Sequence, residues 1–207
     1  FWGIKLKQMK EIIQNALQNS FSYADYRKLA SDLVAQGKPT GHDHSEALAQ
    51  FATLNETRMN RLEKTITIDE DVQLKLQNIS NNYIWLVLAE SWCGDAAQIL
   101  PVINKMSAVS NALQLKIVLR DDNDLLMQQF LTNGGKAIPK IIILDAQTLN
   151  VVADWGPRPQ GAKQLILDYK AVHGIVDEAA KIELQKWYLH DKGVAIQYEI
   201  LEIMSRL

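Results

Sequence analysis

The stretch that decides the fold is Glu90-Ser91-Trp92-Cys93-Gly94-Asp95-Ala96, which holds the only cysteine of the chain. An apolar run typical of a buried strand, residues 84–89, precedes it. Apolar residues at helical spacing follow it: Ile99, Val102, Ile103 and Met106. Cys93 is therefore predicted to lie on a turn between a strand and a helix, where free backbone N–H groups and the helix dipole favour a thiolate.

Short strands and helices alternate around this turn. The pattern predicts strands over residues 65–68, 84–89, 115–119, 141–144 and 151–155, and helices over residues 70–79, 95–109, 124–131 and 160–172. Three helices are predicted before them, the second capped by Ser22 and the third starting near Ser45. Gly193 is predicted to separate two helices at the C-terminal end, which we interpret as plain core helices. We expect an α/β domain over residues 65–172, a helical extension over residues 1–64 packed on it, and C-terminal helices over residues 173–207.

Three separated landmarks resemble those of the thioredoxin family. Trp92-Cys93-Gly94 resembles the first half of the family's active-site motif, Ile138-Pro139 resembles the loop whose cis proline faces the active-site sulfur, and Gly156 matches a glycine that lines the substrate groove. The order of strands and helices is also similar to that of a thioredoxin-like domain with an extra first strand. The resemblance implies a thioredoxin-like fold, a central mixed sheet flanked by helices.

A longer pattern resembles a bacterial branch of single-cysteine thioredoxin-family proteins. It consists of Leu54-Asn55-Glu56-Thr57-Arg58-Met59, Trp92 to Gln98, Leu119-Arg120-Asp121, Leu131 to Gly135, Ile138-Pro139-Lys140 and Trp155-Gly156-Pro157-Arg158-Pro159. This branch is named for its fold, so the resemblance implies the fold and leaves the reaction open.

The departures from the family pattern concern its redox chemistry. Ala96 stands where the family has its second, resolving cysteine, so the isolated chain cannot close an intramolecular disulfide. Val87 stands where a thioredoxin has a buried aspartate that relays a proton. Asp95 replaces the proline of the motif, and its charge beside Cys93 is expected to raise the pKa of the thiol, against the effect of the helix dipole.

Two functions are compatible with this site. The leading hypothesis is a monothiol oxidoreductase, in which the Cys93 thiolate forms mixed disulfides with a disulfide-bearing protein or a low-molecular-weight thiol and a second thiol resolves them. The alternative is a redox-inactive binding module that holds a peptide or a small molecule in the groove. A third hypothesis, ligation of an iron–sulfur cluster, is disfavoured because Asp95-Ala96 replaces the Phe-Ser of single-cysteine glutaredoxins, so no cofactor is predicted.

The candidate site has two parts. Cys93 is the candidate catalytic residue, and the groove around it is predicted to include Trp92, Gly94, Asp95, Ala96, Ile138, Pro139, Trp155 and Gly156. A possible anion-binding set consists of Arg58, Arg120, Lys140 and Arg158. The resemblance implies that the segments of Arg120, Lys140 and Arg158 end near the active-site edge, and Arg58 shares a helix face with Arg61 and Lys64. Salt bridges with surface acids are the alternative role for these cations.

Other motifs carry weaker signals. His42-Asp43-His44 has metal-ligating residue types, but alternate residues in a turn diverge and no other His or Cys completes a tetrahedral set, so no metal site is predicted. Asn133-Gly134-Gly135-Lys136 lacks the frame of a phosphate-binding loop and is interpreted as a turn.

The composition excludes several classes of partner. The formal net charge is −2 and charged residues of both signs are interspersed, which predicts no nucleic-acid partner. No apolar run approaches the ~20 residues that cross a bilayer, so no membrane partner is predicted. The single cysteine and a start that does not resemble a secretory signal lead us to expect a cytoplasmic protein. The sequence makes no prediction of the oligomeric state.

Overall fold

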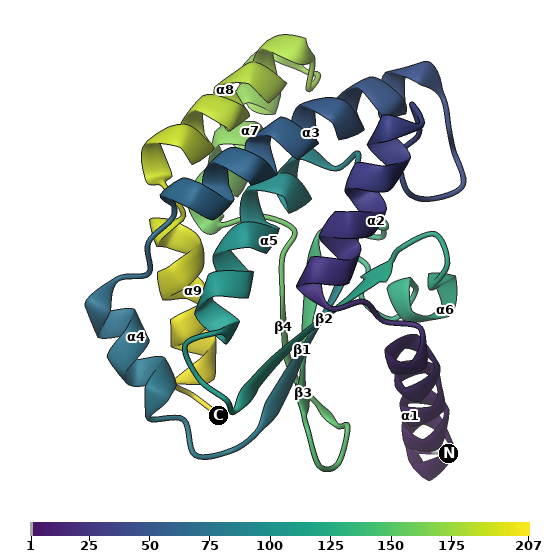
Figure 1. Ribbon diagram of the computed structural model, residues 1–207, viewed down its shortest axis with the longest axis vertical. Helices are drawn as coiled ribbons and strands as arrows, with labels where there is room; N and C mark the ends of the chain where they lie inside the picture. The colour runs from purple at the N-terminus through teal and green to yellow at the C-terminus, as the bar shows by residue number, and fades with distance from the viewer. Residues whose placement is uncertain (1) are drawn as a thin grey trace.

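The structure is a computed structural model that describes residues 2–207, with side chains from residue 7 onward. Its elements are α1 (Trp2–Gln18), α2 (Tyr23–Ala35), α3 (Glu46–Thr65), α4 (Glu70–Gln77), β1 (Tyr83–Ala89), α5 (Gly94–Ser107), β2 (Leu113–Leu119), α6 (Asp124–Met127), β3 (Lys140–Asp145), β4 (Val151–Trp155), α7 (Gln160–His173), α8 (Glu178–Asp191) and α9 (Val194–Met204). In Figure 1 the strands run through the middle of the molecule with helices on either side. This is the mixed α/β architecture that the sequence predicts.

The sheet has four strands in the order β2-β1-β3-β4. β1 pairs parallel with β2 and antiparallel with β3, and β3 pairs antiparallel with β4. All seven residues of β1 are buried, because helices cover both faces of this central strand and its apolar run has no polar side. β1 ends at Ala89, so the turn that carries Cys93 begins at the edge of the sheet where its parallel strands end.

The predicted strand over residues 65–68 is wrong. α3 continues to Thr65, and the extended residues that follow belong to no strand. Side chains satisfy their backbone instead: Lys105 Nζ donates to the carbonyl of Ile66 at 2.5 Å, and Gln197 Nε2 donates to that of Thr67 at 3.1 Å. Gln197 also accepts the N–H of Asp69 at 2.8 Å, so one amide takes the place of a neighbouring strand.

The remaining predicted strands and helices are confirmed, with shifts of their ends. The largest difference is α6, which stops at Met127 although the apolar pattern extends to residue 131. Ser22 caps α2 as predicted, since its side chain accepts the N–H of Asp25 at 3.1 Å, and Ser45 precedes α3. Gly193, with φ +79°, separates α8 from α9.

The helices at both ends of the chain pack on the same unit. α3 lies against α5, and α9 lies against α4 and α5. The apolar stripes of the last two helices are buried, as expected for core helices, at Leu184, Tyr188, Ile196, Ile200 and Met204. No helix among the described residues is both long enough and apolar enough to cross a membrane.

Candidate functional site

Cys93 lies at the start of α5 and faces the loop before β3. It occupies the N-cap position of the helix, where its sulfur accepts the N–H of Ala96 at 3.5 Å. The thiol donates to the carbonyl oxygen of Ile138 at 3.3 Å, and the Ile138–Pro139 peptide bond is cis. Two segments that are far apart in the sequence therefore meet at the sulfur, as the resemblance implies.

The thiol is neutral at physiological pH. Only 8% of Cys93 is exposed, and burial, followed by the negative charge of Asp95, raises the pKa of the thiol to about 12. The N–H groups of Ala96 and Asp95 and the charge of Arg158 lower this pKa, but they do not offset desolvation. The helix start therefore holds a protonated sulfur, which is a poor nucleophile.

Asp95 is fixed by residues from two later segments. Arg158 donates from Nε to Oδ2 at 2.8 Å, and its Nη2 lies 2.8 Å from the same oxygen in an ion pair. The hydroxyl of Tyr188, in α8, donates to Oδ1 at 2.8 Å. Asp95 is 8% exposed, so this carboxylate is held within the protein next to the thiol and does not face solvent. Arg158 is thereby committed to an internal partner.

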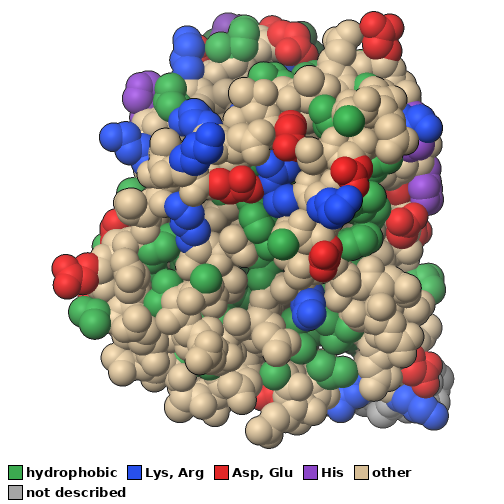
Figure 2. Space-filling model, in the orientation of Figure 1, with side chains coloured by type: hydrophobic (Ala, Val, Ile, Leu, Met, Phe, Trp, Pro, Cys, Tyr) green, Lys and Arg blue, Asp and Glu red, His purple; other side chains and the backbone are tan. Residues whose placement is uncertain are grey.

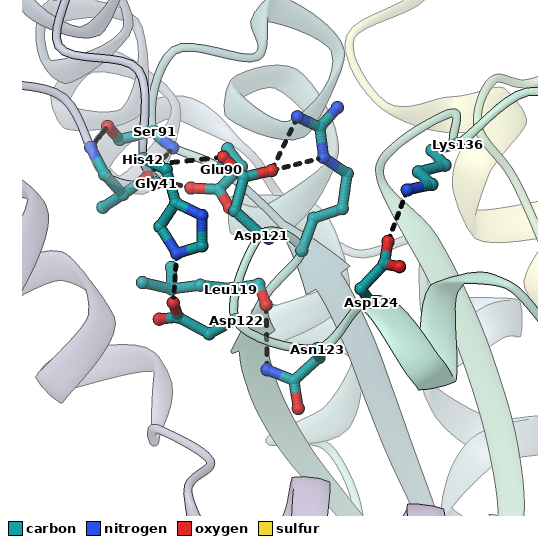
Figure 3. Close-up of polar contacts among 12 residues, drawn as sticks. Gly41, His42, Glu90, Ser91, Leu119, Asp121, Asp122, Asn123, Asp124 and Lys136 are labelled. Atoms are coloured by element: carbon teal, nitrogen blue, oxygen red, sulfur yellow. Dashed lines mark hydrogen bonds and ion pairs between the residues drawn. The ribbon is translucent and has the colours of Figure 1, made fainter.

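A second buried carboxylate, Glu90, lies on the other side of Cys93 in the sequence (Figure 3). Its Oε2 accepts the hydroxyl of Thr40 at 2.5 Å, and its Oε1 accepts the N–H of Asp121 at 3.0 Å. Thr40 also accepts the N–H of Ser91 at 2.7 Å. Burial raises the pKa of Glu90, and the charge of Asp121 acts in the same direction. These bonds fix the segment between α2 and α3 to the end of β1.

The histidine motif belongs to this same contact. Gly41 has φ +83°, and a Cβ there would lie 2.5 Å from Oδ2 of Asp121, so the close approach requires glycine. Nε2 of His42 contacts Oδ1 of Asp122 at 2.8 Å, as Figure 3 shows, and Nε2 of His44 contacts the carbonyl of Gly41 at 3.0 Å. No group of three or more His, Cys, Asp or Glu side chains suited to a metal ion occurs within residues 2–207 as the structure describes them.

A pocket of about 600 Å³ opens beside Cys93, between α3 and α8. Such a volume is within the range of small-molecule sites. Its floor is the turn Trp92 to Asp95, and its walls are mainly apolar side chains of the two helices: Leu48, Phe51 and Leu54 of α3, and Ile182, Leu184 and Leu189 of α8. Three of the wall residues, Leu54, Ile182 and Leu189, are about half exposed, at 46%, 55% and 51%. Figure 2 shows Lys and Arg side chains gathered over the upper left of this face, where α8 and the end of α3 lie.

The predicted anion-binding set is divided among separate places. Arg58 and Arg158 line the pocket with Cys93. Arg120 lies 4.8 Å from the ring centre of Trp92 and pairs with Asp121 at 2.7 Å, in the cluster around Glu90. Lys140 is buried and pairs with Asp154. The four cations therefore do not form one site.

The remaining predicted groove residues, Ala96, Ile138, Pro139, Trp155 and Gly156, do not line this pocket. Ile138 is buried, and the carbonyl of Pro139 would overlap any Cβ placed on Gly156, whose φ is +117°. Nε1 of Trp155 donates to Glu199 at 2.8 Å, which ties the end of β4 to α9. Of these residues, Ile138 and Ala96 contact the sulfur, whereas the pocket beside Cys93 is lined mainly by α3, α8 and the turn of the cysteine.

Sequence reasoning missed the walls of this pocket. Leu48 and Phe51 of α3 and Tyr188 of α8 lie in helices that the sequence predicted only as packing elements. Neither the pocket wall nor the bond of Tyr188 to Asp95 was therefore predicted. One signal was available in the sequence: α8 has apolar residues, such as Ile182 and Leu189, that do not lie on its buried face. Apolar residues that lie outside the buried face of a helix indicate a second apolar surface, which a ligand or a partner can contact.

Comparisons with known proteins agree with this architecture. A family model described as thioredoxin matches residues 41–179, so the match includes α3, which lies before the α/β unit. A crystal structure of an HIV epitope scaffold matches with a TM-score of 0.56 at 20% identity, covering 90% of this chain and 99% of that one. A protein of unknown function from Pseudomonas aeruginosa matches with a TM-score of 0.46 at 21% identity, covering 89% of this chain and 98% of its own. No curated protein matches the chain.

Proposed function

The chain belongs to the thioredoxin family, and from that premise we propose that it is a redox-inactive binding module for a small molecule. The observation that carries the proposal is the apolar pocket of about 600 Å³ at Cys93, enclosed by α3 and α8. Pockets of this size with apolar walls and a few polar groups are the usual form of a small-molecule site. In this proposal the thiol is part of the pocket floor.

The state of the thiol supports binding over exchange. Nucleophilic attack on a disulfide needs a thiolate, and a pKa of about 12 leaves on the order of a thousandfold less thiolate at neutral pH than a free cysteine has. The chain also has no second cysteine to resolve a mixed disulfide. Both observations argue against the thiol–disulfide exchange that the family's motif would otherwise imply.

Binding is tested with Nile red, a neutral dye that fluoresces in apolar sites. We expect the wild type to enhance its fluorescence and Leu54→Asp, which places a charge in the pocket wall, to abolish most of the enhancement. Leu167→Asp is the matched control, because Leu167 is 49% exposed, close to the 46% of Leu54, and lies on α7 outside the pocket. Equal enhancement by both variants would reject the pocket as the binding site.

Monothiol exchange remains the second candidate, favoured by one contact. The sulfur accepts the N–H of Ala96 at a helix start, an arrangement that stabilises a thiolate once it forms. In that reaction the Cys93 thiolate attacks one sulfur of a disulfide, the S–S bond breaks, and the other half leaves as a thiolate. A thiol in solution then attacks the mixed disulfide and releases Cys93.

Alkylation by iodoacetamide separates the two candidates. For the binding module we expect the folded protein to react at pH 8 at least about a hundredfold more slowly than the urea-unfolded chain. The folded rate should still be rising at pH 10, whereas the unfolded rate levels off above about pH 9, because the folded pKa is about 12. Folded Cys93 that reacts as fast as the unfolded chain, and forms an adduct with glutathione disulfide detected by mass spectrometry, would establish the monothiol candidate.

A further inference from the structure

Four cationic side chains line the pocket, and Arg58 differs from the other three. The others pair with acids: Arg158 with Asp95, Lys181 with Glu178, and Lys186 with Glu183. Arg58 has no acidic oxygen within 4 Å among the described residues. Within the part of the chain whose side chains are described, it makes one side-chain hydrogen bond, from Nη1 to Oδ1 of Asn55 at 2.8 Å.

Asn55 holds Arg58 in this position. The Asn55 side chain is 2% exposed, and its Nδ2 donates to the carbonyl of Ser91 at 2.8 Å, on the turn that leads to Cys93. The guanidinium consequently lies over that turn, where a Cβ on Gly94 would be 3.5 Å from Nη1. The same Cβ would lie 3.4 Å from Nε2 of Gln185, so the amide of Gln185 and the guanidinium both lie beside the turn.

The Arg58 guanidinium is half-buried and remains charged. Desolvation, followed by the charge of Arg61, lowers the pKa of Arg58, while Asp95 acts against this shift. Arginine stays protonated at physiological pH, so the pocket retains a cation that has lost part of its water. A guanidinium has five N–H donors in a planar fork, and Asn55 accepts only one of them. The rest match a carboxylate, which accepts two parallel N–H bonds.

The balance of charge in the pocket determines the charge of the ligand. Once the three pairs are set aside, one positive charge remains, and it lies beside an apolar wall that includes Phe51, Leu54 and Ile182. A second negative charge on a ligand would find no unpaired cation in the pocket, and a charge without a partner in a partly dehydrated site is costly. A monoanion with an apolar body fits both the charge and the wall.

We propose that the pocket binds a monocarboxylate with a single apolar chain, its carboxylate paired with Arg58 and its chain lying between α3 and α8. This inference rests on the proposed function, because it assigns a ligand class to the same pocket. It places the carboxylate above the turn at Gly94 and the chain against Leu54 and Ile182.

The test is calorimetric titration of the folded protein with decanoate and with decanol, which share a chain and differ in charge. We expect the wild type to bind decanoate at least about tenfold more tightly than decanol. Arg58→Gln should bring the decanoate affinity down to that of decanol and leave decanol binding unchanged. Arg61→Gln is the matched control, since Arg61 lies one turn further along α3 outside the pocket, and it should alter the decanoate affinity by less than about twofold.

The outcomes separate this inference from the proposed function. Decanol binding as tightly as decanoate to the wild type, or decanoate binding unchanged in Arg58→Gln, would overturn the role of Arg58 and leave the apolar pocket as a binding site. If neither decanoate nor decanol binds, and the wild type does not enhance the fluorescence of Nile red, the pocket is not a binding site and the proposed function is rejected.

Discussion

Two buried carboxylates flank Cys93, and they are held in different ways. Glu90 lies three residues before the cysteine and is bound by neutral donors, the Thr40 hydroxyl and the backbone of Asp121. Asp95 lies two residues after it and is bound by a guanidinium, that of Arg158, and by the hydroxyl of Tyr188. In both cases at least one partner comes from outside the predicted unit of residues 65–172.

The difference shows what each carboxylate does for the site. No cationic side chain from residue 7 onward is bonded to Glu90. Burial raises its pKa, and it joins the segment before α3 to the end of β1. Asp95 forms an ion pair, joins α8 to α5, and its charge raises the pKa of the Cys93 thiol. The first is a structural contact, and the second both lines the pocket and adds to the effect of burial on the pKa of the thiol.

The largest effect is expected from Asp95→Ala. It leaves a guanidinium without its partner, a change that costs ~3–5 kcal/mol in fully buried pairs. Because the Arg158 side chain is 30% exposed and gains water, we expect a loss of about 2–3 kcal/mol in the free energy of unfolding, measured by urea denaturation. Asp71→Ala, which removes an exposed pair with Lys75, is the matched control and should cost less than about 1 kcal/mol.

Asp95→Asn tests the second role of the same residue. The amide keeps an oxygen for Tyr188 or Arg158 but carries no charge, so the pKa of Cys93 should fall and alkylation at pH 8 should become faster. An unchanged alkylation rate in a folded Asp95→Asn protein would show that burial alone controls the thiol.

The contribution of Glu90 to the free energy of unfolding is expected to depend on pH. Its folded pKa is raised above the unfolded value of about 4.5, so the stability it contributes is present below pH 4.5 and is lost as pH rises through the folded pKa. Glu90→Gln should therefore gain stability relative to the wild type between pH 4.5 and pH 8. Glu90→Ala should lose about 1–3 kcal/mol at pH 7, because the Thr40 hydroxyl and the Asp121 N–H lose their acceptor. If the difference in unfolding free energy between Glu90→Gln and the wild type stays constant across this pH range, the pKa of Glu90 is not raised in the folded protein.

The sequence predicted the fold well where the spacing of apolar residues follows the buried face of a strand or a helix. The apolar run of β1 and the spacing in α5 located the turn of Cys93, and their positions are confirmed. Thr65-Ile66-Thr67-Ile68 alternates like a strand but forms none, because the amide of Gln197 bonds to Thr67 and Asp69 there. Gln197 is more than a hundred residues away in the chain, so no local pattern contains this partner.

The turn of Cys93 and the two arginines were predictable as site residues, but the pocket walls and the pairing of the arginines were not. The sequence placed Cys93 opposite Ile138 and listed Arg58 and Arg158 together, yet it gave no way to tell which arginine an acid neutralises. That distinction depends on Tyr188 and Arg158 meeting Asp95 through tertiary packing. The raised pKa of the thiol also depends on burial by helices that no motif connects to the turn.

The smallest effect is expected at His42, in the exposed part of the cluster around Glu90. Its hydrogen bond to Asp122 raises the pKa of His42, so the stabilising contribution is complete below the unfolded pKa of about 6.5 and is lost as pH rises through the folded value. Relative to His42→Gln, the wild type should have a slightly higher urea midpoint at pH 5.5 and the same midpoint at pH 8.5. An Asp122→Asn variant should return the NMR titration midpoint of His42 toward 6.5. A wild-type midpoint that already equals the unfolded value would show that this contact does not form in solution. The segment before α3 would then be fixed by its other bonds, those of Thr40 to Glu90 and Ser91 and that of the His42 N–H to Asp121.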